Sequence, residues 1–351
     1  MIRSVMRRTL PRSAFVFVLG TAFAAAVGAQ VPGAPGTPPA PGTPAATERV
    51  LSVATLAPSG STWMRGLNAL NRELRRRTNN AVSLRIYAGG VQGDESEVIR
   101  KMRQGRLDGA VVTGIGLGQI HRPALAFMLP GMFRNQAGLD RARAALVGEV
   151  SQQFRTAGFE LAAWGESGSP RLFSQREIRT PTDLRQVRPW VWREDVILPQ
   201  MFQEVGATGV PLSLPEVLSA LQTHRIDTVI APPVATVALQ WSAHFTHMSE
   251  GANSFGVGGF VFSRQAWDSL PADQQAVTRE VINQFQTLIG RNINRDDAAA
   301  ITSMAGRGVT TVSYTEAERA QWTAMFTRMR ARLVGVVSDA AWMDRVRTAG
   351  N

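Results

Sequence analysis

The sequence predicts an α/β fold of two lobes followed by a long helical C-terminal region. From about residue 48 onward, strand and helix patterns alternate along the chain, which is typical of parallel sheets with helices packed on them. The segment 104–112, QGRLDGAVV, is echoed at 223–231 by THRIDTVIA. Each copy places an Arg, a Leu or Ile and an Asp before a buried strand. The chain has 351 residues, of which 44% are hydrophobic, and this length suits about two domains.

The first lobe is predicted to hold three strands that alternate with helices. The strands are expected at 50–56, 82–87 and 107–113. The helices are expected where apolar side chains recur at helical spacing. These side chains are Trp63, Leu67, Leu70 and Leu74, then Val98 and Met102, and finally Leu139, Ala142, Leu146, Val150 and Phe154. With a return segment at about 252–290, this lobe is expected to span residues 48–163.

The second lobe is predicted at 164–251, with residues 291–351 packing across both lobes. Strand patterns occupy 159–164, 189–192 and 226–230, and helical patterns occupy 196–205 and 215–222. Pro232 and Pro233 end the last of these strands. The glycine- and serine-rich segment at 165–169 is interpreted as the crossover between the lobes.

The C-terminal region reads as helical. Pro271 opens a helix with an apolar stripe at Val277, Val281, Phe285 and Leu288. Thr315 and Glu318 have the spacing of a capping box, in which each side chain bonds the other residue's amide. Behind this cap, one helix face carries Trp322, Phe326, Met329 and Leu333, which we interpret as core.

The N-terminus has the form of a secretory signal. Four arginines, at positions 3, 7, 8 and 12, precede an apolar run at 14–27 that ends in small residues. The run is shorter than the ~20 residues that a spanning helix needs. We therefore predict a signal peptide at 1–29, with a retained membrane anchor as the alternative. Residues 30–47, rich in Pro, Gly and Ala, form a predicted linker.

Composition excludes several classes of function. The chain has no cysteine and four histidines, which excludes thiolate chemistry and argues against a multi-histidine metal site. The formal net charge is +11, but the arginines are scattered among acids at helical spacing, so solvated faces are expected rather than a nucleic-acid site. Neither a cofactor nor a metal is predicted.

Three short motifs approach catalytic or binding signatures without completing them. Ser167 lies in Gly-Glu-Ser-Gly-Ser, which lacks the last glycine of a hydrolase elbow; a serine hydrolase stays a weak alternative. The glycines at 114–118 lack the third glycine of a dinucleotide loop. His244 and His247 lack a nearby carboxylate for metal binding. The residues therefore indicate an exported binding protein with its ligand between the lobes, at the carboxyl ends of strands.

Several segments, taken in order, resemble the DctP-type solute receptors of tripartite ATP-independent periplasmic (TRAP) transporters. They are Gly90–Gly93 with Glu97–Ile99, Gly105–Asp108, Leu129–Arg134, Ile178–Leu184, Glu216–Thr223 with Asp227, and Ala266–Pro271. The resemblance runs from about Val50 to the region of Leu333. It implies a periplasmic binding protein fold with hinge strands, a small-molecule ligand, integral membrane subunits as partners, a periplasmic location and no enzymatic activity.

The chain departs from the family pattern at the ligand site. In the family, an arginine on the strand after the Asp-Leu pair clamps a ligand carboxylate, and here that slot holds Trp190. Ile230 and Ala231 stand where the family commonly has a polar Glu-Asn pair. Arg171 matches an earlier family arginine if a gap is allowed. It is interpreted either as the remaining polar anchor or as a structural ion-pairing residue.

The predicted ligand-binding set combines these slots with neighbouring strand ends. Its members are Arg171, Trp190, Trp192, Ile230, Ala231, Pro232, Thr113 and Gly114. Trp190 and Trp192 share a strand face by the period of two. The set favours a neutral, apolar or aromatic ligand. The open alternatives are an organic acid held by Arg171 with a displaced Arg188 or Arg193, and a periplasmic scaffold without a small ligand.

Overall fold

The computed structural model describes residues 48–251 and 254–351. The predicted signal peptide, its anchor alternative and the linker lie outside these residues. Among the helices of the two described stretches, none combines the length and the hydropathy that crossing a bilayer requires.

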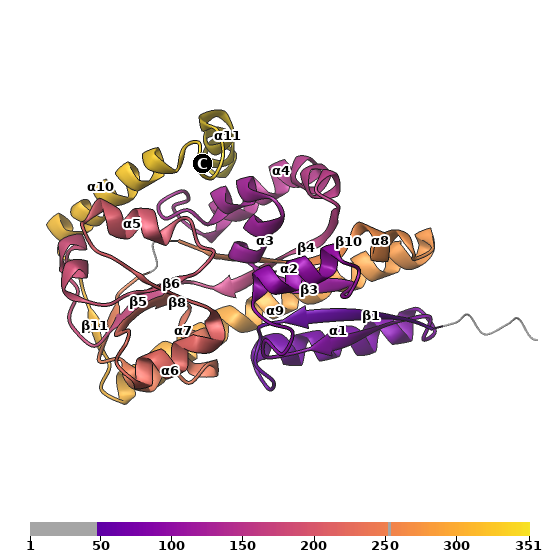
Figure 1. The fold of residues 1–351 in the computed structure, drawn as a ribbon, viewed down its shortest axis with the longest axis horizontal. Coiled ribbons are helices and arrows are strands. Elements are labelled where there is room, and N and C mark those ends of the chain that lie inside the picture. The colour runs from indigo at the N-terminus through magenta and orange to yellow at the C-terminus, as the bar shows by residue number, and fades with distance from the viewer. Residues whose placement is uncertain (1–47, 252–253) are drawn as a thin grey trace, which may run out of the picture. The chain divides into compact units, whose positions relative to one another are not determined.

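The first lobe is built on a five-stranded sheet in the order β2-β1-β3-β10-β4 (Figure 1). Its strands are β1 (Arg49–Thr55), β2 (Val82–Tyr87), β3 (Gly109–Thr113), β4 (Phe159–Gly168) and β10 (Gly256–Ser263). β1 pairs in parallel with β2 and β3, whereas β10 runs antiparallel to both β3 and β4. The sheet is therefore mixed, because β10 enters it from the second lobe in the reverse direction.

Helices cover both faces of this sheet. They are α1 (Thr62–Arg77), α2 (Glu95–Arg103), α3 (Gly114–Ile120), α4 (Gln136–Thr156), α8 (Arg264–Asp268) and α9 (Ala272–Gly306). Phe260 and Val261, neighbours on β10, enter different cores because successive side chains of a strand point to opposite faces. The core around Phe260 contains α1 and α9 residues, and the core around Val261 contains residues of α2, α3 and α4.

The second lobe has a four-stranded sheet in the order β11-β9-β5-β8 and a two-stranded ribbon, β6-β7. The strands are β5 (Arg171–Ser174), β6 (Trp190–Trp192), β7 (Val210–Leu212), β8 (Thr228–Ala231), β9 (His247–Ser249) and β11 (Thr310–Val312). The helices are α5 (Leu198–Glu204), α6 (Val217–Gln222) and α7 (Pro233–Ala238). The core of this lobe includes Phe173, Trp190, Leu221 and Trp241. Short 3₁₀ helices occupy Arg122–Met128, Pro181–Gln186, Leu214–Glu216 and Ser242–His244.

The 35-residue helix α9 contributes to the cores of both lobes. Val281 and Ile282 lie in the core of the first lobe, and Ala300 and Met304 lie in that of the second. The predicted stripe of this helix is wrong at Leu288, which is 48% exposed. With about 3.6 residues per turn, the buried face that starts at Ile282 continues through Ile289 and Ile293, so that Leu288 faces solvent.

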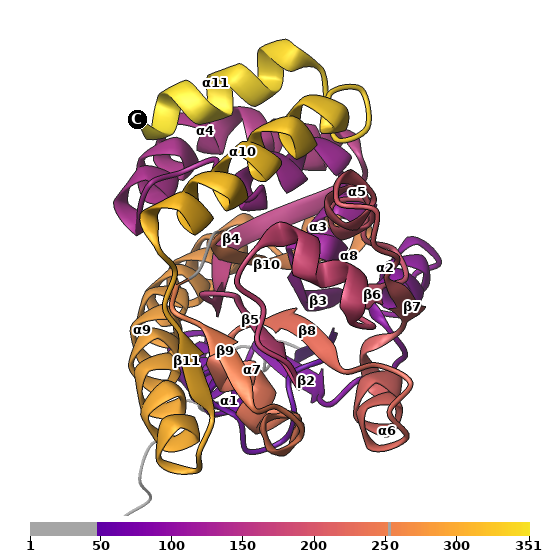
Figure 2. The ribbon, with the colours of Figure 1, turned by 90° about the vertical axis from the view of Figure 1, so that its left-hand side faces the viewer.

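Two helices end the chain, α10 (Glu316–Leu333) and α11 (Ala340–Gly350). Figure 2 shows them beside α5 and α4, and α10 contacts α5 whereas α11 contacts α4. The predicted capping box is confirmed, because the Glu318 amide donates to Thr315 Oγ1 at 3.3 Å and the Thr315 amide donates to Glu318 Oε2 at 2.7 Å. The expected core side chains from Trp322 to Leu333 are buried.

Candidate ligand cavity between the lobes

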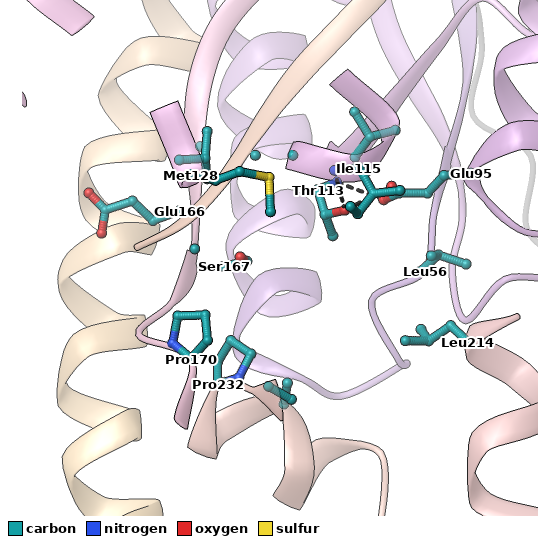
Figure 3. Close-up of a pocket in the computed structure, with 18 of the residues that line it drawn as sticks. Leu56, Glu95, Thr113, Ile115, Met128, Glu166, Ser167, Pro170, Leu214 and Pro232 are labelled. Atoms are coloured by element: carbon teal, nitrogen blue, oxygen red, sulfur yellow. Dashed lines mark hydrogen bonds between the residues drawn. The ribbon is translucent and has the colours of Figure 1, made fainter. Parts of the chain in front are cut away.

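A cavity of about 240 Å³ lies between the two lobes and is lined by both. The first lobe contributes residues at the ends of the parallel strands β1 and β3, including Leu56 and Thr113. The second lobe contributes Ile230 and Pro232 from the end of β8, together with β6 residues. Figure 3 shows Thr113 and Met128 on one side of this space and Pro170 and Pro232 on the other. This is the edge at which ligands bind in open α/β sheets.

Seven of the predicted site residues line this cavity. They are Thr113, Gly114, Trp190, Trp192, Ile230, Ala231 and Pro232. Thr113 also starts α3, because its hydroxyl accepts the Ile115 amide at 3.2 Å. The glycine-rich segment 114–118 that resembled a dinucleotide loop is thus part of a helix.

Arg171 is not among the residues that line the cavity. Its Nη1 donates to the carbonyl oxygens of Ser249 at 2.8 Å and of Glu250 at 2.7 Å. Burial lowers its pKa, and the charges of Asp297 and Glu250 act in the opposite direction. In this structure the guanidinium is held at the end of β9, which fits the alternative in which Arg171 is structural, and its contact with a ligand stays a prediction.

The two arginines considered as displaced anchors are also engaged elsewhere. Arg188 Nε lies 3.2 Å from Asp227 Oδ2, and Arg193 Nη2 lies 2.8 Å from Glu216 Oε2. Neither arginine lines the cavity. Among the described residues that do line it, none is Arg, Lys or His.

An indole cluster forms the wall contributed by the second lobe. The ring centroid of Trp190 lies 5.6 Å from that of Trp192 and 5.5 Å from that of Trp241. Trp190 Nε1 donates to the Leu212 carbonyl oxygen at 3.1 Å, so its one polar atom already has a partner. The Trp190 ring therefore offers the cavity aromatic carbon rather than a free hydrogen-bond donor. Trp241 was not predicted, since it comes from a loop far from the other two in sequence.

Glu95 is a buried acid of the lining that sequence reasoning missed. Its carboxylate accepts the Thr113 amide at 2.6 Å and the Thr113 hydroxyl at 2.8 Å. Burial raises its pKa to about 7, although these hydrogen bonds oppose the rise. Figure 3 shows this pair at the cavity edge. The signal in the sequence was an acid in the first turn of a helix, which is common at helix starts and did not by itself mark a site.

Two further acids, Asp195 and Glu166, also line the cavity. Asp195 accepts the Ile197 amide at 2.6 Å and the Leu198 amide at 3.4 Å, and burial raises its pKa to about 6. Burial also raises the pKa of Glu166, opposed by Arg143, whose Nη1 lies 4.0 Å from Glu166 Oε1. Figure 3 shows the Glu166 carboxylate directed away from Ser167. The described lining is therefore mainly apolar, with buried Glu95 and Asp195 and half-buried Glu166 as its acids.

Ser167 lines the cavity but stands within the extended strand β4. No histidine belongs to the described part of the lining, so a Ser-His pair does not meet there. The described lining therefore offers binding surface and no Ser-His pair.

Comparisons with known proteins agree with the motif-based resemblance. A family model described as bacterial extracellular solute-binding protein, family 7 (DctP) matches residues 53–334. A solute-binding protein of Verminephrobacter eiseniae is 21% identical over 288 residues, covering 81% of this chain and 84% of the relative.

Solved structures show the same fold. A TRAP periplasmic solute-binding protein from Ralstonia eutropha with bound (S)-2-acetolactate matches with a TM-score of 0.80 at 19% identity, covering 86% of this chain and 98% of that chain. The sugar acid binding protein from Advenella mimigardefordensis in complex with galactonate matches with a TM-score of 0.81 at 14% identity, covering 87% and 98%. These matches confirm the predicted two-lobed α/β fold. Since the family model covers most of the chain, this protein belongs to the DctP family of bacterial extracellular solute-binding proteins, which are receptors for transport and not enzymes.

Proposed function

We propose that this receptor binds one small molecule in the cavity between its lobes and presents it to the integral membrane subunits of a TRAP-type transporter. The support is the family match together with a cavity that draws its lining from both lobes. A ligand that touches both lobes favours their closed arrangement, and a membrane partner can distinguish that arrangement from the open one. In this proposal the chain is exported to the periplasm and its signal peptide is removed after Ala29.

We propose further that the ligand is uncharged and apolar or aromatic where it is buried. The observation that carries this is the absence of Arg, Lys and His from the described lining, with Trp190 in the slot of the family arginine. Burying a carboxylate without a paired cation costs several kcal/mol even after relaxation. Packing on an indole returns roughly 1.5–3 kcal/mol for an apolar group. The balance favours a ligand without charge at this end.

An organic acid is the second candidate, and the relatives favour it over an apolar ligand. The Ralstonia protein holds acetolactate and the Advenella protein holds galactonate, both of which carry a carboxylate. For this chain to bind such a ligand through Arg171, the guanidinium would have to leave the Ser249 and Glu250 carbonyl oxygens. The positive charge of Arg171 would also have to reach a cavity whose lining already holds three acids, Glu95, Glu166 and Asp195.

Calorimetry separates these candidates. The titrants are 4-methylbenzyl alcohol, octanoate and succinate, and the proteins are the native chain, Trp190→Arg and Arg171→Ala. We expect the native chain to prefer the alcohol and Trp190→Arg to gain affinity for succinate, because the new guanidinium offers a carboxylate two donors. Tight succinate binding by the native chain that Arg171→Ala abolishes would establish the organic-acid receptor instead. Binding of none of the three, with no small molecule recovered from the purified protein, would favour the scaffold.

A further inference from the structure

The residue that caps the N-terminus of α2 makes hydrogen bonds from one lobe to the other. Asp94 caps α2 in the first lobe, and its Oδ1 accepts the Glu95 amide at 2.8 Å. Its Oδ2 accepts Trp192 Nε1 at 2.9 Å. The same oxygen accepts the Leu214 amide at 3.1 Å. One carboxylate of the first lobe therefore holds two donors of the second.

A second contact crosses at the same place. Ser96, in the first turn of α2, donates its hydroxyl to Glu194 Oε1 at 3.0 Å. Glu194 follows β6 closely in the chain, so the contact joins the same two elements as the Asp94 bond to Trp192. The contacts thus form a patch between the start of α2 and the β6-β7 region.

The two residues whose N–H groups bond Asp94 are part of the ligand cavity, whereas Asp94 is not. Trp192 and Leu214 line the cavity, and Asp94 does not. Trp192 packs against Trp190, with 5.6 Å between the ring centroids. Hydrogen bonds to an ionised acceptor are roughly twice as strong as neutral ones, so the carboxylate fixes the orientation of an indole that forms part of the cavity wall.

We infer that Asp94 is a positioning residue for ligand capture: it orients the Trp192 indole and holds the two lobes together around the cavity. The inference rests on the proposed receptor function for its meaning, but its geometry is independent of any ligand. Loss of the carboxylate releases both donors of the second lobe at once. The closed arrangement then becomes less populated, and apparent affinity falls in proportion to that population.

The test measures the distance between the lobes in ligand-free protein. The native chain has no cysteine, so nitroxide labels can be placed at Asn68→Cys on α1 and Gln222→Cys on α6, both exposed positions. Double electron-electron resonance then gives the distribution of distances between the two labels. For Asp94→Ala we expect a roughly tenfold lower ratio of closed to open molecules, as loss of charge-assisted hydrogen bonds predicts.

Three further variants test whether the lost carboxylate is the cause of lobe opening in Asp94→Ala. Asp94→Ser keeps a side chain that caps α2 but removes the carboxylate that bonds the second lobe. The lobes of this variant should therefore open as they do in Asp94→Ala. Trp192→Phe keeps an aromatic ring and removes the indole N–H donor. Its effect should not add to that of Asp94→Ala, because both remove the same bond. Asp268→Ala, an exposed acid on α8, should leave the distance unchanged.

A native distance distribution in Asp94→Ala and Asp94→Ser would overturn the inference. Full additivity of Asp94→Ala and Trp192→Phe would do so as well. If these variants open the lobes while no small molecule binds the native chain, the receptor proposal fails, and only the part of the inference in which Asp94 holds the two lobes together stands.

Discussion

Single residues decide the character of the cavity. Trp190, which lines the cavity, could be placed there from sequence, because the motif before it fixes the strand and the period of two fixes its face; its contact with a ligand stays a prediction. Arg171 could not be placed, since the same local pattern allows its long side chain to reach either the cavity or the carbonyl oxygens of Ser249 and Glu250, and the structure has the second. Glu95 escaped notice because its burial arises from tertiary packing against Thr113.

Glu95 carries a prediction about pH. Burial raises its pKa from 4.5 to about 7, so between these values the folded chain keeps a proton that the unfolded chain has lost. The free energy of unfolding should therefore fall as pH rises through this window. In Glu95→Gln this contribution is absent, and the stability of the variant relative to the native chain should increase from pH 4.5 to 7. Urea denaturation at several pH values measures it, with exposed Glu316→Gln as control. A native-minus-variant difference that does not change with pH would contradict the assignment.

Among the helices and strands, the alternation of strand and helix patterns predicted the first three strands and the helices between them. The strand period of two and the helix period of about 3.6 residues are both strong in this part of the sequence. The β10 strand was not assigned, since all of its residues are buried and its pattern therefore lacks alternation. β4 extends to Gly168, beyond the strand expected at 159–164, because β10 pairs along it up to that residue. The end of such a strand is set by pairing with a strand from a distant part of the chain. The local sequence pattern does not contain that pairing.

Helix α9 carries a prediction about how elements are joined. Asp297 is buried, and its two oxygens accept the Ser169 amide at 2.9 Å and the Val234 amide at 2.8 Å. These donors lie in the crossover after β4 and at the start of α7. Asp297→Ala leaves both amides without this acceptor, which should lower the free energy of unfolding by about 1–3 kcal/mol. Chemical denaturation measures the loss, and Asp273→Ala in the exposed first turn of α9 is the matched control. Equal stability of the two variants would show that Asp297 does not join these elements.

At the scale of the whole molecule, two lobes that share a cavity should move. The predicted boundaries, with the first lobe at 48–163 and about 252–290 and the second at 164–251, stay predictions. Saturation with a compound of the panel that binds should reduce the radius of gyration, because contacts with both lobes favour the closed arrangement. Small-angle scattering measures the radius, and circular dichroism should show unchanged helix content. A constant radius at saturation would reject closure by rigid lobes.

The central claim is that this receptor captures an uncharged small molecule between its lobes. Mass spectrometry of compounds extracted from gently purified native protein and from Trp190→Arg tests it most directly. We expect about one neutral apolar or aromatic molecule per native chain and its loss from the variant. Recovery of a sugar acid or dicarboxylate from the native chain would contradict an uncharged ligand.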